Sequence, residues 1–141
     1  MAEEIRVAVD LAEGMHFIGR NEAGLQVDLD SPAEGGGAGP SPMALVLMSL
    51  AGCSGMDVAS IMRKKRQELK GLTVIARGTR GEEYPKPYTA IQLEYQFTGT
   101  NITPEACVRA IELSRDRYCP VWAMLRATVA ISYSYTINGV G

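Results

Sequence analysis

The chain has 141 residues, of which 46% are hydrophobic and 21% are charged, and its formal net charge is -2. These values are ordinary for a soluble globular protein, and they exclude the strongly basic composition typical of nucleic-acid-binding proteins. The length predicts a single domain over residues 1–141, with a core that needs neither disulfides nor a metal. Residues 1–10 lack the basic start and apolar centre of a signal peptide, so we expect a cytoplasmic protein in a reducing compartment.

Residues 1–30 predict a β-meander. Apolar and polar side chains alternate over 4–11, and two further strands are expected at 16–19 and 25–29. The polar residues between the second and third strands suit a hairpin turn. The glycines within 32–40 then predict either a flexible linker or a mobile flap.

A long central helix is predicted over residues 41–68. Ser41 suits the N-cap, and Pro42 suits the first helical position, where its missing N–H costs no hydrogen bond. Ahead of the basic run at the end of the helix the only formal charge is Asp57, so the helix is apolar on all sides. Such a length could span a membrane, but the serines, glycines and Asp57 within it favour the buried centre of a soluble fold. We expect no membrane span.

Residues 71–141 predict a ββαβ portion. Two strands are expected at 72–80 and 88–99, an amphipathic helix at 104–117 and a closing strand at 127–137, and residues 121–125 allow one short helical turn before that strand. The elements in chain order are therefore βββ–α–ββ–α–β. This order is typical of an α+β domain with an antiparallel sheet.

Cys53 lies near the middle of the long helix, between small residues, and both packing and chemistry are open to it. The neighbouring glycines each cost a helix ~1 kcal/mol relative to alanine, which indicates close approach by a backbone, a ligand or a second helix. Asp57 follows one turn later on the same face, so a reactive Cys53 thiolate would need a compensating cation. Arg20, at the end of a strand, is the best candidate for this cation, with Arg6 and Arg77 as competitors.

Cys119 lies at a helix end, before Pro120 and near several arginines. This position predicts an exposed thiol in basic surroundings that attacks or resolves a disulfide; the alternative is a partly buried cysteine under a loop. Cys107 falls inside the amphipathic helix and is interpreted as core. The single histidine, His16, is interpreted as structural or surface, and without a CxxC pair no zinc site or other cofactor is expected.

Residues 41–62 around Cys53, together with the RYCPV sequence around Cys119, resemble the OsmC/Ohr family of osmotically induced and organic-hydroperoxide-resistance proteins. The resemblance extends over most of the chain and includes the Ser-Pro entry to the long helix and the order of the elements. It implies an intertwined homodimer in which the two long helices pack centrally and the active sites lie at the subunit interface.

The resemblance also implies a chemistry for the two cysteines. The Cys53 thiolate would attack an organic hydroperoxide and become a sulfenic acid, Cys119 would resolve it as a disulfide, and an external dithiol would reduce that disulfide. Typical peroxidase members have a glutamate at the start of the helix that orients an arginine onto the thiolate. This chain has Met43 and Ala44 at those positions.

Our first hypothesis is therefore a thiol-dependent peroxidase that reduces organic hydroperoxides, with Cys53, Cys119 and Arg20 as its site residues. The absent glutamate motivates an alternative, a non-catalytic protein of the same fold that binds an apolar small molecule at the dimer interface. A further alternative is a redox-responsive dimer whose cysteines cross-link under stress.

Overall fold

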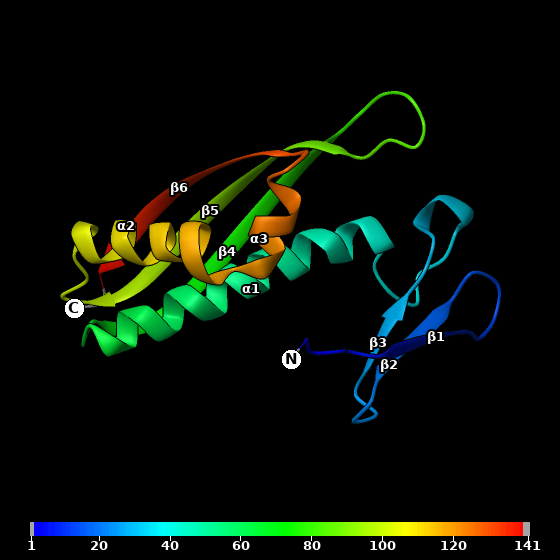
Figure 1. Cartoon of the computed structure of the whole chain (residues 1–141), viewed down its shortest axis with the longest axis horizontal. Helices are drawn as coiled ribbons and strands as arrows, with labels where there is room; N and C mark the ends of the chain where they lie inside the picture. The colour runs from blue at the N-terminus through cyan, green and yellow to red at the C-terminus, as the bar shows by residue number, and fades with distance from the viewer. Residues whose placement is uncertain (1, 140–141) are drawn as a thin grey trace. The chain divides into compact units, whose positions relative to one another are not determined.

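The structure is a computed structural model that describes residues 2–139. The predicted order of elements is confirmed, and a short helix, α3, is added before the last strand (Figure 1). The elements are β1 (Val7–Leu11), β2 (Phe17–Asn21), β3 (Gln26–Leu29), the 3-10 turn η1 (Pro32–Glu34), α1 (Pro42–Lys64), β4 (Glu68–Arg80), β5 (Tyr88–Thr100), α2 (Pro104–Leu113), the π-helical turn η2 (Ser114–Tyr118), α3 (Pro120–Leu125) and β6 (Ala130–Gly139). They fall into two compact units that divide between Val46 and Leu47, so the single-domain assignment stays a prediction.

In the first unit, β1, β2 and β3 form the antiparallel meander predicted from the sequence. Val9 is paired with Gly19, and Gly19 with Val27, so these residues share one face of the sheet. Val9 and Val27 are each 51% exposed, which leaves this apolar face largely uncovered within the chain. Arg20 lies on the opposite face and forms an ion pair with Asp10 at 3.8 Å.

The segment predicted as a linker or flap is folded around Asp30, which is only 7% exposed. The Asp30 carboxylate accepts hydrogen bonds from the backbone N–H groups of Ala38, at 3.0 Å, and Ser31, at 2.7 Å. These bonds, that of Ala38 foremost, lower the pKa of Asp30. Gly36 packs directly on the carboxylate, where a Cβ atom would collide with it, so glycine is required at that point.

In the second unit the sheet order is β4–β5–β6. The β4–β5 pair is antiparallel, but β6 runs parallel to β5, which corrects the prediction of an antiparallel sheet at this strand. The cause is the long connection through α2, η2 and α3, which carries the chain back to the end of the sheet where β5 began (Figure 1). Thr103 caps α2, since its Oγ1 accepts the Ala106 N–H at 3.3 Å.

The core lies between this sheet and the helices α1 and α2. Alternate residues of β5 are at most 1% exposed, as the sequence pattern predicts: Ile91, Leu93, Tyr95 and Phe97. From α2 the buried residues are Ala106, Cys107, Ala110 and Ile111. The prediction that Cys107 belongs to the core is confirmed. Its burial raises the pKa of its thiol to about 11.

Helix α1 begins as predicted, with Ser41 Oγ accepting the Ala44 N–H at 3.1 Å. Over its length it buries one stripe with a four-residue spacing, formed by Leu50, Ser54, Val58 and Met62. Its other apolar residues are less covered, and Met56 is 77% exposed. Within residues 2–139, α1 is the one helix whose length and composition would allow it to cross a membrane.

Candidate active site

The two cysteines singled out by the sequence lie together in the second unit. The Sγ atoms of Cys53 and Cys119 and a carboxylate oxygen of Asp57 are all within 4.8 Å of one another. Cys53 and Asp57 are one turn apart on α1, so the helix itself places both on one face. Cys119 comes from the junction of η2 and α3 on the other side of the site.

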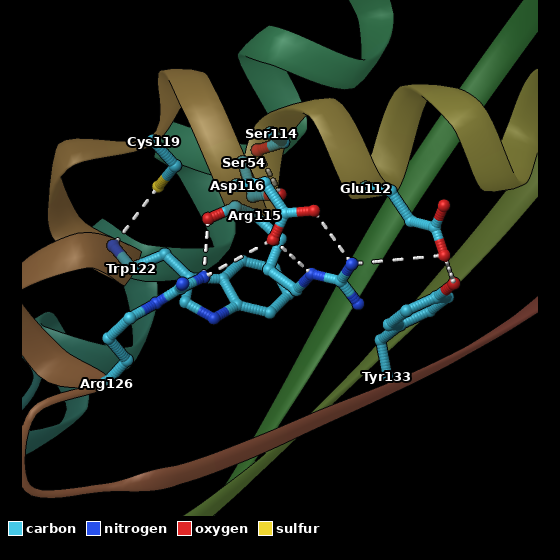
Figure 2. A network of polar contacts seen from close by, with 9 residues as sticks. All are labelled: Ser54, Glu112, Ser114, Arg115, Asp116, Cys119, Trp122, Arg126 and Tyr133. Atoms are coloured by element: carbon cyan, nitrogen blue, oxygen red, sulfur yellow. Dashed lines mark hydrogen bonds and ion pairs between the residues drawn. The ribbon is translucent and has the colours of Figure 1, made fainter.

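A π-helical turn delivers Cys119 to this position. In η2 the Cys119 N–H donates to the carbonyl oxygen of Ser114, five residues earlier, at 2.9 Å. Pro120 then ends the turn and starts α3, and the Cys119 Sγ accepts the Trp122 N–H at 3.3 Å (Figure 2). Trp122 is 2% exposed, so it belongs to the core beside Cys119.

The surroundings of Cys119 differ from the sequence prediction of an exposed, basic thiol. Cys119 is only 2% exposed, and burial, with the neighbouring Cys53, raises the pKa of its thiol to about 12. Arg115 instead forms a bidentate ion pair with Asp116, in which its guanidinium donates to the two carboxylate oxygens at 2.7 and 2.8 Å. Arg126 donates to the carbonyl oxygen of Arg115 at 2.6 Å (Figure 2). Arg115 and Arg126 are therefore directed to oxygen acceptors, the Asp116 carboxylate and the Arg115 carbonyl.

A chain of buried hydroxyl groups ends on Asp57. Tyr95 OH lies 2.6 Å from Ser54 Oγ, which lies 2.8 Å from Ser114 Oγ, which in turn donates to Asp57 Oδ2 at 2.9 Å. The residues of the three hydroxyls are fully buried. Ser114 Oγ is placed to donate both to Ser54 Oγ and to Asp57 Oδ2, and because a hydroxyl has one proton it makes one of these two donations at a time. We refer to Tyr95, Ser54 and Ser114 as the hydroxyl chain.

The hydroxyl chain was not predicted from the sequence as part of the site. One signal was present, because Ser54 and Ser114 are polar residues at inward positions of otherwise apolar helical patterns. Burial raises the pKa of the Tyr95 phenol, so this hydroxyl stays protonated and available to donate. The chain thus fixes the side-chain orientation of Asp57 next to the two sulfurs.

Asp57 also reaches a cleft. A cleft of about 340 Å³ is lined by Asp57 and Lys64 of α1 and by Tyr118 of η2, among others. The carboxylate therefore contacts the hydroxyl chain on one side and solvent on another. Cys53 and Asp57 are half-buried, so both can be reached from outside while Cys119 cannot.

The same three residues could hold a metal ion. Two thiolates and one carboxylate are a donor set that suits Zn²⁺, and a tetrahedral ion would keep one position for water. The Ser114 hydroxyl and the Trp122 N–H would be outer-shell partners of the carboxylate and of one thiolate. A zinc site was not predicted from the sequence, because the chain has no CxxC pair and only one histidine.

The remaining candidates have other contacts within their own units. Arg20, in the first unit, is paired with Asp10, and its role as the cation of Cys53 stays a prediction. Of its two competitors, Arg77 pairs with Glu94 at 3.1 Å. His16 is half-buried, with its Nε2 3.4 Å from Asp28, which agrees with a structural role.

Comparison with known proteins identifies relatives over nearly the whole chain. A family model described as OsmC-like protein matches residues 35–134. The protein YhfA of Escherichia coli strain K12 is 38% identical over 133 residues, which cover 94% of this chain and 98% of YhfA.

Solved structures support the same fold. An OsmC-like protein from Mycoplasma pneumoniae has a TM-score of 0.82 at 19% identity, covering 97% of this chain and 99% of that one. An organic hydroperoxide resistance protein from Legionella pneumophila has a TM-score of 0.68 at 15% identity, covering 96% and 98% of the two chains.

Proposed function

Because the chain belongs to the OsmC-like family, we propose that it reduces organic hydroperoxides through a redox cycle of Cys53 and Cys119. The observation that carries the proposal is the position of the two sulfurs, within 4.8 Å of each other although the residues are far apart in sequence. A half-buried thiol beside a buried one is the arrangement expected of an attacking and a resolving cysteine. The Legionella relative, described as an organic hydroperoxide resistance protein, supports the substrate class.

The reaction would proceed in three balanced steps. The Cys53 thiolate attacks a peroxide oxygen, so that an S–O bond forms, the O–O bond breaks, and the alcohol leaves after taking up a proton. The Cys119 sulfur then attacks the Cys53 sulfenic acid, forming the disulfide and releasing water. An external dithiol reduces the disulfide and returns both thiols.

Substitution of each cysteine tests the proposal. Cys53→Ser should abolish consumption of cumene hydroperoxide, and Cys119→Ser should allow one oxidation and leave a sulfenic acid that dimedone labels on Cys53. Cys107→Ser is the matched control, since Cys107 is buried in the core of α2 and should leave turnover intact. Full hydroperoxide consumption by Cys53→Ser protein would contradict the proposal.

We propose further that the protein acts as a homodimer. Met56 is 77% and Met48 is 54% exposed on α1, and both would be covered by a second copy. Between them α1 presents small residues, Ala51 and Gly55, to an open groove of about 460 Å³ against β4. Close packing of a second helix explains small residues at these positions better than solvent does.

Light scattering coupled to size exclusion tests the dimer. Met56→Glu should shift the mass toward that of the monomer, because it places a charge in the apolar contact. Arg109→Glu, exposed on α2, is the control and should leave the mass unchanged. A monomeric wild-type protein at micromolar concentration would contradict the dimer.

A further inference from the structure

We infer that Cys53, Cys119 and Asp57 form a redox-controlled Zn²⁺ site: the reduced protein holds one ion between these three side chains, and formation of the Cys53–Cys119 disulfide releases it. The metal site is independent of the proposed function. The release by an organic hydroperoxide rests on that function, because the hydroperoxide is the oxidant that forms the disulfide.

The three ligand atoms are gathered in the space that one zinc ion needs. The two Sγ atoms and one carboxylate oxygen of Asp57 all lie within 4.8 Å of one another. Bonds of about 2.3 Å to sulfur and about 2.1 Å to oxygen in a tetrahedron set the ligand atoms about 3.6 to 3.8 Å apart. Cys53 and Asp57 are half-buried, so small rotations of their side chains can close this difference.

The backbone presents the ligands from two sides of the site. Cys53 and Asp57 are four residues apart on α1, the spacing at which helical zinc motifs direct two ligands to one ion. Cys119 is the N-cap of α3 and approaches from the other side. The cleft of about 340 Å³ that Asp57 lines connects the site to solvent, so water can supply the fourth position.

Hydrogen bonds orient two of the three ligands. The Ser114 hydroxyl donates to Asp57 Oδ2 at 2.9 Å, which leaves the second carboxylate oxygen available to an ion. The Trp122 N–H donates to Cys119 Sγ at 3.3 Å (Figure 2). Such outer-shell partners accompany protein metal sites, because they fix the direction of each ligand before the ion arrives.

The charges of the site favour a divalent cation. Asp57 beside Cys53 opposes a thiolate when no cation is present, so the peroxide chemistry alone does not account for it. Arg115 and Arg126 are engaged with the Asp116 carboxylate and with a backbone carbonyl oxygen. A zinc ion would reduce the charge of two thiolates and a carboxylate from three negative charges to one. The two sulfurs select Zn²⁺ over Mg²⁺ or Ca²⁺, which prefer oxygen ligands.

Oxidation removes two of the three ligands. The Cys53 sulfur attacks a peroxide oxygen, an S–O bond forms, the O–O bond breaks, and the alkoxide leaves as the alcohol after taking a proton from solvent. The Cys119 sulfur then attacks the Cys53 sulfur, and the hydroxide leaves as water after taking a second proton. The two thiolates have given the two electrons that reduced the peroxide. Because thiolates are the zinc ligands and disulfide sulfurs are not, Asp57 remains alone and the ion is released.

Cobalt absorption spectroscopy tests the metal site without any hydroperoxide. Co²⁺ added to reduced, metal-free protein should give a thiolate-to-cobalt charge-transfer band that saturates at one ion per chain and disappears when Zn²⁺ displaces the cobalt. Cys119→Ser should lower the band intensity, because one thiolate ligand is gone. Ser114→Ala should weaken cobalt affinity by about 10- to 100-fold, the usual effect of losing an outer-shell partner.

Cys107→Ser is the matched control and should leave the cobalt spectrum and affinity unchanged, since Cys107 is buried elsewhere in the core. Absence of the charge-transfer band from the wild-type protein would overturn the metal site. A band of full intensity in Cys119→Ser would do the same, and so would wild-type affinity in Asp57→Ala.

A fluorescent zinc indicator tests the release. Cumene hydroperoxide added to zinc-loaded protein should free the ion as the disulfide forms, and so should diamide, which oxidises a thiol pair without a peroxide. If mass spectrometry shows the disulfide while zinc stays bound, the release is refuted. If diamide frees the ion and cumene hydroperoxide does not, the proposed function fails and the redox-controlled metal site stands.

Discussion

Ser54 is the central link of the hydroxyl chain, and its removal should cost more than the loss of one hydrogen bond. Ser54→Ala leaves the fully buried Tyr95 hydroxyl without the partner that lies 2.6 Å away. It also removes the contact at 2.8 Å to Ser114. A buried donor left unsatisfied costs about 1–3 kcal/mol, so we expect the free energy of unfolding to fall by about 3 kcal/mol.

Tyr95→Phe removes only the end of the chain. The hydrogen bond that Ser114 donates to Ser54 remains, so the expected loss is about 1 kcal/mol, the net contribution of one hydrogen bond. In the double variant the buried Tyr95 hydroxyl is absent and so is not left without a partner, and the free energy of unfolding should fall by about 2 kcal/mol in total. The two substitutions should therefore be strongly non-additive, with a coupling energy of about 2 kcal/mol.

Urea unfolding at one fixed protein concentration measures all three variants, and the fixed concentration is needed because a dimer adds a concentration term. Ser60→Ala, on the exposed side of α1, should change the unfolding free energy by less than about 0.5 kcal/mol. If the losses of Ser54→Ala and Tyr95→Phe add to that of the double variant within about 0.5 kcal/mol, the two hydroxyls are not coupled and the hydroxyl chain is refuted.

Three further predictions follow from the thiols. In the native protein iodoacetamide should label Cys53 long before Cys107, because Cys107 is fully buried and should react only in urea. Mass spectrometry of the labelled peptides measures this difference, and rapid labelling of Cys107 in the native protein would contradict it. The pKa of Cys119 is raised in the folded state to about 12, so its contribution to stability is complete below the unfolded pKa near 9 and is lost as pH rises toward 12. Urea unfolding from pH 8 to 11 should show Cys119→Ala with a shallower decline than the wild type, by up to about 1.4 kcal/mol per pH unit, and equal slopes would count against a buried neutral thiol. Finally, equimolar Zn²⁺ should protect Cys53 from alkylation until a chelator is added, and Asp57→Ala should weaken this protection, whereas unaltered labelling of wild-type protein in Zn²⁺ would exclude the three-ligand site.

Much of the fold could be predicted because its signals are local. The caps at Ser41 and Thr103 act within one helical turn, and the alternation along β5 shows directly in the four alternate buried positions 91, 93, 95 and 97. The direction of β6 could not be predicted in the same way. Whether a strand returns parallel or antiparallel depends on the path of the connection before it, and α3 was only a possible helical turn in the sequence.

For the site, the sequence supplied the residue types and the structure supplied their environments. The motifs around Cys53 and Cys119 singled out the pair, but the arginines next to Cys119 suggested an exposed, basic thiol. Sequence neighbours are a poor guide at a helix junction, because the backbone turns there and sends adjacent side chains to different surroundings. The link from Tyr95 to Ser114 joins three separate elements, so no local pattern could contain it.

The π-helical turn has a consequence for the length of the chain between α2 and α3. An α-helix advances about 100° per residue, so one residue more or fewer ahead of Cys119 would rotate its thiol by roughly that angle. Deleting Arg117 would let η2 relax to an ordinary α-helical turn and carry the Cys119 sulfur away from Cys53. The spacing of five between Ser114 and Cys119 is thus as much a part of the site as the residues themselves. A relative that keeps both cysteines but lacks this extra residue would be expected to hold them apart.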